Sequence, residues 1–428
     1  MEKSIYQLPL QVLSRRAFYR KSQFWTIEQL QKFQLEQLKK LLIHSGKNVL
    51  YYRELFRSIN FDPSKFENLD QMKSIPLLDK ETVRTRAKDL LADSAGKFGI
   101  TWDSTSGSTG TPLHFVLSDN AQAIKIAALL RSFGWAGYRI GMKTFCAQSY
   151  YFKDADFKFN RFYNILRFDS NRLSKKSAVS VMKKNNQIKP KFYLGFPFDL
   201  LMLAKYAEEE GVQIHSPKSI VTYGETLSQG RREQLEKYYK CKVHNFFSMH
   251  EGSAMISECE KGNLHLIEDF AFHEIVEDNG NSKLVGTNFY NYSMPLIRYD
   301  IKDSIIPSDQ TECTCGRKFR TIKEIQGKAC DFIQTSDGRI LGAVMSHSID
   351  NAKGVICSQI IQSKINEIIV KTIVDETYNE NSQNVLEFGL RNRLGNEIKI
   401  VFQVVNKLEK RPGGKTPFIL SKIGNEYN

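Results

Sequence analysis

The chain has 428 residues, with 61 Lys and Arg against 47 Asp and Glu, which gives a formal net charge of +14. At ~100–200 residues per domain, this length allows about two to four domains and a sizeable core. Hydrophobic residues make up 41% and charged residues 25%, which is ordinary for a globular protein and excludes a disordered or collagen-like chain. No apolar run approaches the ~20 residues of a membrane-spanning helix, and Met1–Arg20 lacks the apolar block of a secretory signal.

The basic residues are scattered along the chain and form only short clusters, such as Lys39-Lys40, Lys183-Lys184 and Arg231-Arg232. A nucleic-acid-binding protein should combine basic clusters with a recognisable module. The sequence has no DNA-reading zinc finger, RNA-binding aromatic motif or heptad zipper. We therefore expect no nucleic-acid partner and at most a peripheral association with an acidic membrane surface.

The seven cysteines of the chain are odd in number and widely spaced. Without an export signal, this usage argues against a disulfide framework and for a reducing compartment. We therefore expect a cytoplasmic protein.

The first 95 residues are predicted to be a helical lead-in. In Ile27–Ile43 apolar residues recur three and four positions apart, which is the pattern of an amphipathic helix, and Asp79–Asp93 repeats it. After Gly99, short apolar runs alternate with helical stretches, which predicts an α/β core with at least partly parallel sheets. The predicted strands are His114–Leu117, Lys191–Gly195, Ser219–Tyr223 and Val243–Phe247, and the predicted helices are Asn120–Phe133, Phe198–Glu210 and Gln229–Tyr239.

From Phe270 to Ile306 the pattern becomes more purely β. Asn279-Gly280 stands between two alternating apolar runs, which is a strong hairpin signal. Beyond Gly327 an α+β segment follows, with strands predicted near Glu367–Val374 and Glu397–Val405. Its length of about a hundred residues suits a small separate domain.

The stretch Thr105–Pro112 (TSGSTGTP), here called the phosphate loop, is the most informative for chemistry. It combines five hydroxyl residues with two glycines in eight positions. Glycines let a backbone turn tightly and present its N–H groups to an anion, and hydroxyls add further donors. The composition favours phosphate binding, although a surface loop rich in Ser, Thr and Gly is the alternative.

This loop resembles the phosphate loop of the adenylate-forming superfamily, the acyl-CoA synthetases and their relatives. Within it the chain is most similar to the phenylacetate–CoA ligase branch and to that branch's capsular-polysaccharide-biosynthesis members. The motifs that carry the resemblance occur in order along most of the chain. They are Tyr51–Phe56, Ile75–Lys80, Ser106–Pro112, Trp135–Gly137, Gly195–Pro197, Tyr223–Glu225, Pro295–Asp303 and a lysine near the end.

The resemblance implies a large N-terminal adenylation domain, residues 1–327, and a small mobile α+β domain, residues 328–428. In the large domain the helical lead-in would be followed by an ATP-binding α/β core of mixed and parallel sheets flanked by helices, and by a β-rich part at about 255–327. The implied reaction has two steps. A carboxylic acid attacks the α-phosphate of ATP to give an acyl-adenylate and pyrophosphate, and coenzyme A, an amine or a hydroxyl then takes the acyl group.

The resemblance also implies which residues bind ATP. The phosphate loop would hold the β- and γ-phosphates, with Leu113 where the wider superfamily often has a lysine. Asn245–Glu251 matches the aromatic–Gly–x–Thr–Glu motif, with Phe247 stacking on adenine, Ser248 in place of the glycine and His250 in place of the threonine. The implied nucleotide-binding residues are Thr105, Ser106, Gly107, Ser108, Thr109, Gly110, Thr111, Gly224, Glu225, Phe247, Ser248, Asp303 and Lys328.

The sequence departs from the family pattern, or leaves an alternative, at two positions of this set. Asp303 stands where the family has the aspartate that binds the ribose hydroxyls, and Asp300 is an open alternative. Lys328 replaces the usual arginine of the hinge motif, where Cys330 replaces the first aspartate and leaves Asp331 as the hinge acid.

Three residues are implied to be catalytic. Lys415 stands where the family keeps its adenylation lysine on a mobile loop, and its ammonium would neutralise charge at the α-phosphate. Glu251 would bind Mg²⁺, because a carboxylate is a hard oxygen ligand suited to that ion. His250 precedes it at the position that contacts the α-phosphate.

A second constellation has its own chemistry. Cys259 and His265 have five residues between them, and Cys313 and Cys315 follow with one residue between them. Three thiolates and an imidazole suit tetrahedral Zn²⁺, although unligated buried cysteines are the alternative. Members of the resembled branch carry similar residues in this region. Four protein ligands would leave no open position, so the site is predicted to be structural.

The leading hypothesis is therefore an ATP-dependent, AMP-forming ligase that uses Mg²⁺, a structural Zn²⁺ and a small-molecule carboxylic acid, plausibly in capsule or other surface-polysaccharide biosynthesis. The acceptor is left open between coenzyme A and a sugar amine or hydroxyl, and a homodimer is compatible with the sequence. The alternative is a degenerate nucleotide-binding scaffold or a basic nucleic-acid-binding protein.

Overall fold

The computed structural model of the chain describes residues 10–95, 100–104, 113–150, 152–278, 281–310, 312–328, 333–336, 340–341, 352–411 and 416–423. The chain forms two compact units. Unit 1 comprises Met1–Ile140 and Phe246–Ile325, and unit 2 comprises Gly141–Asn245 and Gln326–Asn428. The border at Ile325 lies beside the predicted domain boundary at 327–328, but residues 326–428 cluster with 141–245, so that boundary stays a prediction.

Unit 1 begins with helices and continues with a short two-stranded sheet before a long helix. Its first elements are α1 (Leu10–Ser22), α2 (Ile27–Asn48), α3 (Leu50–Ser58), the 3-10 turns η1 (Pro63–Lys65) and η2 (Leu69–Ser74), α4 (Lys80–Thr85), β1 (Ile100–Ser104), β2 (His114–Ser118) and α5 (Asp119–Trp135). Thr26 and Gln29 form a capping box at the start of α2, which satisfies free N–H groups of its first turn. The predicted helices at Ile27–Ile43 and Asn120–Phe133 are confirmed, and both run slightly further than predicted.

The predicted helix at Asp79–Asp93 is wrong beyond Thr85. Backbone groups of its second half are taken up by other segments. The carbonyl of Asp89 accepts from Tyr51 N at 3.0 Å, and Ala92 N donates to Ser293 O at 3.0 Å. These long-range bonds override the helical periodicity of the sequence, because tertiary context decides where local propensity is weak.

The second half of unit 1 is β-rich, as predicted. Its strands are the end of β8 (Lys242–Ser248), β9 (Met255–Glu258), β10 (Leu264–Leu266), β11 (Ala271–Asp278), β12 (Asn281–Asn288), β13 (Tyr299–Pro307) and β14 (Thr321–Lys328). They pair in the order β11-β12-β13-β14-β10-β9-β8. Strands β11 and β12 form the predicted antiparallel hairpin, with Asp278 opposite Asn281. Its turn residues Asn279 and Gly280 lie outside the described residues.

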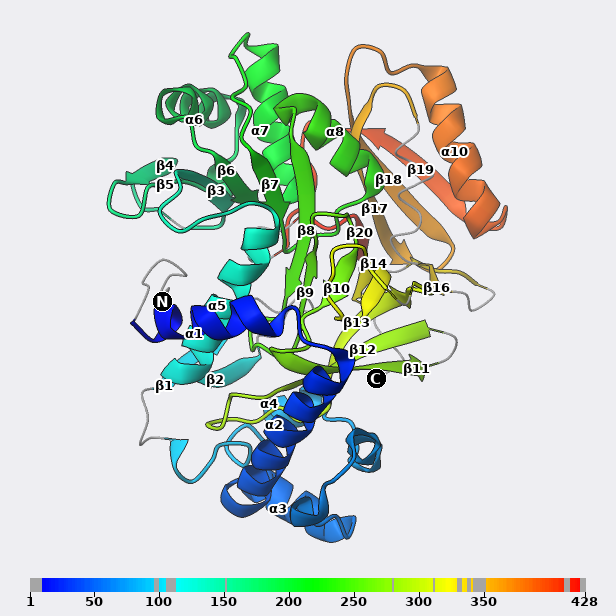
Figure 1. The fold of residues 1–428 in the computed structure, drawn as a ribbon. Helices are drawn as coiled ribbons and strands as arrows, with labels where there is room; N and C mark the ends of the chain where they lie inside the picture. The colour runs from blue at the N-terminus through cyan, green and yellow to red at the C-terminus, as the bar shows by residue number, and fades with distance from the viewer. Residues whose placement is uncertain are drawn as a thin grey trace. The chain divides into compact units, whose positions relative to one another are not determined.

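Unit 2 contains the predicted parallel sheet. Its elements are β3 (Thr144–Gln148), β4 (Phe157–Asn160), β5 (Ile165–Asp169), the 3-10 turn η4 (Ser170–Arg172), α6 (Lys175–Ile188), β6 (Phe192–Gly195), α7 (Pro197–Glu209), β7 (Ser219–Thr222), α8 (Gln229–Tyr239) and the start of β8. Strands β8, β7, β6, β3 and β5 are parallel neighbours in that order. Helices α6, α7 and α8 cover the sheet (Figure 1) and bury Val181, Leu203 and Leu235 against it.

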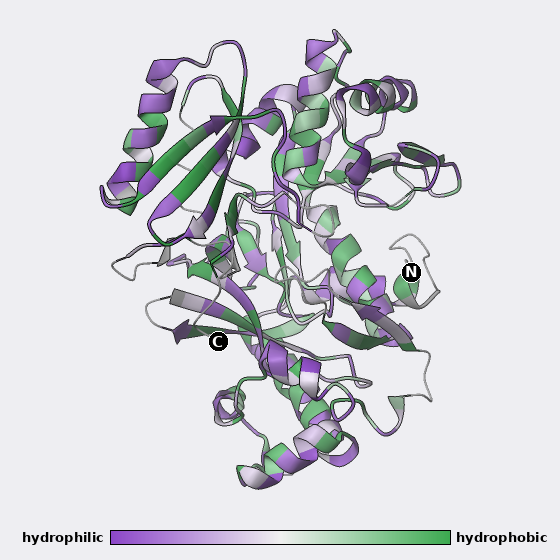
Figure 2. Ribbon diagram, turned by 180° about the vertical axis from the view of Figure 1, so that it is seen from behind, coloured by the Kyte–Doolittle hydropathy of each residue, from purple (hydrophilic) through white to green (hydrophobic). Residues whose placement is uncertain are grey.

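The C-terminal part of unit 2 is a small sheet with one helix packed on it. It contains β15 (Ile333–Gln334), β16 (Ile340–Leu341), β17 (Val355–Lys364), β18 (Glu367–Val374), α10 (Glu380–Leu394), β19 (Lys399–Val404) and β20 (Ile419–Ser421). The larger sheet has the order β19-β18-β17-β20. Hydrophobic and hydrophilic residues alternate around α10 (Figure 2), and Leu386 and Leu390 are its buried face. The predicted α/β class with an α+β C-terminal part is confirmed.

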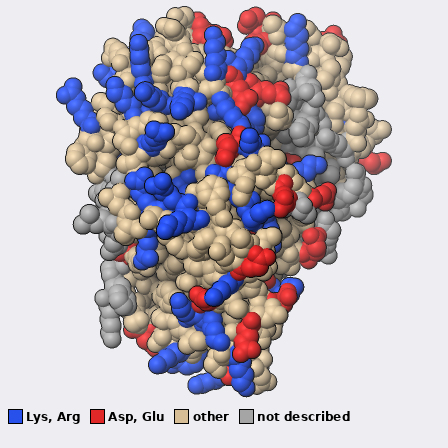
Figure 3. Space-filling model, in the orientation of Figure 1, with Lys and Arg blue, Asp and Glu red and all other residues tan. Residues whose placement is uncertain are grey.

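Two further expectations concern membranes and charge. Within the described part of the chain, no helix combines the length and hydropathy that crossing a membrane requires. On the face shown in Figure 3, Lys and Arg are spread widely and Asp and Glu stand among them.

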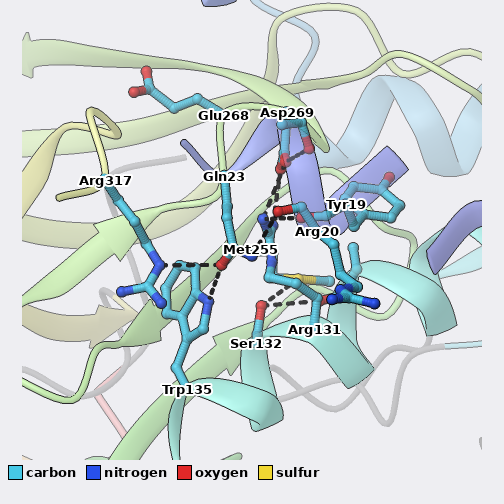
Figure 4. Close-up of polar contacts among 12 residues, drawn as sticks. Tyr19, Arg20, Gln23, Arg131, Ser132, Trp135, Met255, Glu268, Asp269 and Arg317 are labelled. Carbon is cyan, nitrogen blue, oxygen red and sulfur yellow. Dashed lines mark hydrogen bonds and ion pairs between the residues drawn. The ribbon is translucent and has the colours of Figure 1, made fainter. Parts of the chain in front are cut away.

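A buried polar cluster ties the helical and β-rich parts of unit 1 together (Figure 4). Arg131 of α5 donates two hydrogen bonds to the carboxylate of Asp269, at 2.9 and 3.1 Å. The side chains of this ion pair are 5% and 0% exposed. Ser22 of α1 donates to the same carboxylate at 2.5 Å, and the Arg131 guanidinium lies 5.3 Å from the Tyr19 ring centroid. Helix α1 is thereby fixed to α5 and to the β-rich segment.

We expect Asp269→Asn to lower the free energy of unfolding by about 3–5 kcal/mol, because it leaves the buried Arg131 charge uncompensated. Asp70→Asn is a matched control, since Asp70 pairs with Lys73 on the surface with both side chains more than two-thirds exposed, and such pairs contribute only ~0–1 kcal/mol. Urea denaturation of both variants would measure this difference. Equal stability of the two variants would show that the Arg131–Asp269 pair does not hold unit 1 together.

Candidate active site and metal cluster

Strand β8 ends at Ser248 and leads into a tight turn that carries two of the three predicted catalytic residues, His250 and Glu251. The turn is closed by hydrogen bonds from Met249 N to Ala254 O and from Gly252 N to Met249 O, both at 3.0 Å. Gly252 has φ +79°, and an added Cβ would lie 3.0 Å from the Asn288 amide nitrogen. Only glycine adopts this conformation without strain, so the sequence fixes the turn immediately after Glu251.

Glu251 points into the protein and is 1% exposed. Its Oε1 accepts a long hydrogen bond of 3.5 Å from Ser253 Oγ. Its Oε2 has no hydrogen-bond partner among the described residues. A buried carboxylate oxygen without a donor costs free energy unless something else satisfies it. The donor type and this open oxygen fit a Mg²⁺ ligand, which is the role predicted for Glu251.

His250 lies on the exposed side of the same turn and contacts both strands of the two-stranded sheet. Its Nε2 bonds Asp103 Oδ2 of β1 at 2.8 Å. Its ring meets the Phe115 ring of β2 edge to face, with centroids 5.5 Å apart. Partial burial would raise the pKa of Asp103, but the hydrogen bond and ion pair with His250 outweigh burial and hold that pKa below its ordinary value.

Lys125 of α5 reaches the turn from a third element. Its Nζ donates to the carbonyl oxygen of His250 at 2.8 Å. Burial lowers the pKa of its ammonium to about 8, against the attraction of Glu251 and Asp103. Sequence reasoning missed both Lys125 and the pairing of Asp103. No spacing signal could have found them, because Asp103 and Lys125 lie 147 and 125 residues from His250.

The phosphate loop itself, residues 105–112, lies outside the described residues. Its flanking strands are paired up to their last residues, with Asp103 opposite Phe115 and Ser104 opposite His114. The assignments of Thr105, Ser106, Gly107, Ser108, Thr109, Gly110 and Thr111 stay predictions.

The other residues predicted to bind the nucleotide are placed in both units. Phe247 and Ser248 end β8 and are half-buried. Asp300 and Asp303 both lie on β13 and are each 4% exposed. The Asp300 carboxylate is bound by Lys302, through its backbone N–H at 2.9 Å and its ammonium at 3.2 Å. Both aspartates have interactions within the fold, and the assignment of Asp303 to the ribose stays a prediction.

In unit 2, Glu225 follows Gly224, whose φ of +78° forms the turn after β7. The Glu225 carboxylate accepts hydrogen bonds from the backbone N–H groups of Phe198, at 3.3 Å, and Thr416. Burial, and then the nearby Asp199 carboxylate, raise the pKa of Glu225 to about 7. The role of Glu225 at adenine stays a prediction, and the structure adds that this carboxylate holds the backbone of Thr416.

A second contact joins the same C-terminal segment to the parallel sheet. Lys410 donates to the carboxylate of Asp199 at 3.1 Å and to the carbonyl oxygen of Ser170 at 2.9 Å. Asp199 is completely buried, and burial raises its pKa while Lys410 opposes the rise. Lys415 lies between these two anchors in sequence but outside the described residues, as do Cys330 and Asp331. Lys328 ends β14, and its side chain is not described.

The four predicted zinc ligands come together in unit 1. The ligand atoms of Cys259, His265, Cys313 and Cys315 all lie within 4.8 Å of one another. Cys259 Sγ is 3.7 Å from Cys313 Sγ, and Cys315 Sγ is 3.5 Å from His265 Nε2. Tetrahedral Zn²⁺ with Zn–S bonds of ~2.3 Å and Zn–N bonds of ~2.0 Å separates two sulfurs by ~3.8 Å and sulfur from nitrogen by ~3.5 Å. The donor set and its spacing fit this ion.

The surroundings of the cluster orient its histidine. His265 Nδ1 lies 3.0 Å from the carbonyl oxygen of Phe319, so an N–H at that position donates to the carbonyl and leaves Nε2 facing the thiols. The Trp135 ring packs edge to face on His265 at 5.9 Å. The Arg317 guanidinium lies over the Trp135 ring, 4.2 Å from its centroid, and both side chains bind the side-chain oxygen of Gln23 (Figure 4).

The chain is similar to several known proteins in sequence and in fold. A family model described as the CapK C-terminal domain matches residues 332–422. The chain is 26% identical over 388 residues to Protein CapK of Staphylococcus aureus, which covers 88% of this chain and 86% of that protein. It is 24% identical over 425 residues to a phenylacetate-coenzyme A ligase of Thermus thermophilus, with 91% and 94% covered. A crystal structure of 2-hydroxyisobutyryl-CoA ligase in the postadenylation state, in complex with R3-HIB-AMP, matches with a TM-score of 0.76 at 16% identity, over 99% of this chain and 95% of that one.

These similarities confirm the predicted resemblance to the adenylate-forming superfamily and its phenylacetate–CoA ligase branch. The solved structure shows that the chain has the fold of an adenylate-forming ligase. Together the relatives support the predicted enzyme class, an AMP-forming ligase.

The raised pKa of Glu225 generates a prediction about stability. The native state holds this proton more tightly than the unfolded chain, so the stabilisation is present below pH ~4.5 and is lost as pH rises through about 7. The free energy of unfolding of the wild type should fall between pH 5 and pH 8. In Glu225→Gln this fall should be smaller by about 1–2 kcal/mol. Urea denaturation across this range would measure it. The exposed Glu233→Gln should follow the wild-type profile, and a Glu225→Gln profile parallel to both would contradict the assignment.

Proposed function

We propose that this chain, as a relative of the phenylacetate–CoA ligases, activates a small carboxylic acid with ATP and transfers the acyl group to an acceptor. The observation that carries the proposal is the buried Glu251 carboxylate with an oxygen that no described residue satisfies. Glu251 stands in a turn whose neighbour, His250, contacts both strands that flank the phosphate loop. A Mg²⁺ ligand beside a phosphate-binding loop is what ATP chemistry requires.

In the first step, an oxygen of the substrate carboxylate attacks the α-phosphorus of ATP, the bond to the bridging oxygen breaks, and pyrophosphate leaves. Mg²⁺, when bound, supplies neutralisation of charge on the phosphates. The chain's part is to hold Glu251 at a fixed place through the Gly252 turn, to present loop donors to the phosphates, and to bring Lys415 to the α-phosphate. Such preorganised charge stabilises the transition state because it needs no rearrangement during the reaction.

In the second step, a nucleophile attacks the acyl carbonyl carbon, AMP leaves, and the nucleophile loses its proton. The names of the phenylacetate-coenzyme A ligases favour the thiol of coenzyme A as the acceptor. The similarity to Protein CapK favours a role in surface-polysaccharide assembly, where a sugar amine or hydroxyl would serve. A cytoplasmic location and a homodimer belong to the same proposal.

A non-catalytic scaffold or nucleic-acid binder is the alternative. A nucleic-acid-binding module would gather its basic residues, whereas acidic residues stand between them on the face in Figure 3. Salt-sensitive binding to generic DNA without ATP–pyrophosphate exchange would favour the alternative.

We expect the wild-type protein to catalyse ATP–pyrophosphate exchange that depends on Mg²⁺ and on one class of acid. A screen of aryl, hydroxy and amino acids would identify that class, and consumption of coenzyme A in the same assay would identify the acceptor. Lys415→Ala and Glu251→Gln should each lower the exchange rate by about 10²–10³-fold, because each removes charge stabilisation at the transition state. Lys353→Ala is the matched control for a lysine elsewhere in the C-terminal segment. Exchange that is unchanged in Lys415→Ala would contradict the role of that lysine.

We also propose that Cys259, His265, Cys313 and Cys315 bind a structural Zn²⁺. With four protein ligands the ion has no open position for substrate. It would join the β9–β10 segment to the loop before β14 and support the Trp135–Arg317 stack.

Purified protein should contain one Zn²⁺ per chain by metal analysis, and Cys313→Ser should lose it. Chelation or this substitution should lower the free energy of unfolding by about 3–4 kcal/mol, as when a ligand of the native state present at a few hundred times Kd is removed. Cys241→Ser, at a half-buried cysteine outside the cluster, should keep both metal and stability. Wild-type protein without stoichiometric Zn²⁺ would remove the claim.

A further inference from the structure

We propose that His250 is a positioning residue that fixes the stem of the phosphate loop, the paired strands β1 and β2, against the Glu251 turn. The residues that hold His250 in place are Asp103, Phe115 and Lys125. The inference rests on the proposed function and adds to it. It assigns to His250 a task other than contact with the α-phosphate, and it brings three residues into the active site.

His250 contacts one residue on each strand of the stem, and these two residues lie opposite each other. Asp103 and Phe115 are direct partners in the antiparallel pair of β1 and β2. One binds the imidazole nitrogen at 2.8 Å and the other packs against the ring face to edge at 5.5 Å. The two strands can therefore not move apart, or slide along the turn, without losing a contact to the same side chain.

Lys125 fixes the backbone of the same residue from the third side. Helix α5 starts directly after β2, with Ser118 as its N-cap, so the stem and the helix are one continuous stretch of chain. The Lys125 ammonium holds the His250 carbonyl at 2.8 Å, and the aliphatic part of Lys125 approaches Gly252, where an added Cβ would lie 3.8 Å from it. His250 is thus held through its side chain by β1 and β2 and through its backbone by α5.

The exposure of these groups indicates a local rather than a global role. In the His250–Asp103 pair the side chains are 53% and 32% exposed, and ion pairs at such exposure contribute little to the stability of a fold. Their role would be to fix the position of the phosphate loop relative to Glu251. The triphosphate must meet the loop and the Mg²⁺ ligand Glu251 at the same time, and small misplacements of binding groups are costly to catalysis.

The arrangement also suggests a substitute for a missing cation. The wider superfamily often has a lysine just after the proline of the loop, where this chain has the fully buried Leu113. Lys125 supplies a cation on α5 that interacts with both Asp103 and Glu251. It offers positive charge near the base of the loop without a lysine in the loop sequence.

A double-mutant cycle on Asp103 and His250 tests the proposal through the Kd for MgATP, measured by isothermal titration calorimetry. Asp103→Asn and His250→Ala should each weaken MgATP binding by about 5–10-fold, the scale of one ordinary net hydrogen bond. The double variant should be no weaker than His250→Ala alone, because both substitutions break one contact. His250→Gln, which keeps an N–H donor, should recover part of the loss. Lys125→Met should also weaken binding, and Lys125→Arg should restore it.

Controls separate this proposal from stability and from the proposed function. Asp93→Asn removes a comparably exposed ion pair, with Arg53, in the same unit, and should leave the Kd for MgATP unchanged. Melting temperatures of all variants should stay close to wild type. Binding losses of Asp103→Asn and His250→Ala that multiply fully in the double variant, or no loss in either, would overturn the inference. Wild-type protein that does not bind MgATP would instead overturn the proposed function.

Discussion

The buried ion pair between Arg131 and Asp269 is the constraint on which the rest of unit 1 depends. Two charges removed from water are costly unless they are paired and their hydrogen-bonding capacity is satisfied. Here the guanidinium meets the carboxylate with two hydrogen bonds, and Ser22 adds a third donor. Aromatic rings of Tyr19 and Trp135 lie against the guanidinium at 5.3 and 5.1 Å. These contacts therefore fix the orientation of helix α5 against the β-rich segment, and with it the positions of the side chains on α5.

Helix α5 carries groups for two separate sites on different faces. Lys125 and Arg131 are six residues apart, which in an α-helix is ~9 Å along the axis and ~240° around it. Lys125 reaches the His250 carbonyl beside the proposed Mg²⁺ ligand. Arg131 and Trp135, four residues apart on one face, reach Asp269 and the ring of His265 in the metal cluster. Helix α5 therefore connects the Cys/His cluster with the Glu251 turn, and the proposed Zn²⁺ would influence that turn through this helix.

Local patterns were enough to predict elements whose own sequence decides them. Helix α8 and strand β18 occur at their predicted residues, Gln229–Tyr239 and Glu367–Val374, because periodicity and burial agree there. The helix predicted to Asp93 ends at Thr85, because distant backbone groups bind its second half. For the candidate site, the ordered motifs predicted a role for Glu251. The donor chemistry of Cys259, His265, Cys313 and Cys315 predicted a metal site, and the structure brings these four side chains together. These patterns could not point to Lys125 or to the His250–Asp103 contact, since these depend on how α5 and the β1–β2 pair fold back on the turn.

The partners of the buried carboxylates distinguish Glu251, in the candidate site, from acids that stabilise the fold. Asp269 is balanced by Arg131, and Asp199 by Lys410. Each of these two carboxylates forms an ion pair with a basic side chain, although Asp199 Oδ2 has no hydrogen-bond partner among the described residues. Among the residues that the structure describes, no Lys or Arg forms an ion pair with Glu251, and its only hydrogen bond is a long one from Ser253. The Lys125 ammonium attracts Glu251 electrostatically, but its hydrogen bond goes to the His250 carbonyl. Burying a carboxylate oxygen without a hydrogen-bond donor costs stability, and a fold can retain that cost where a ligand offsets it. Under the proposed function, a polyanion with its bound metal would offset this cost, and the net charge of +14 favours the approach of such a ligand.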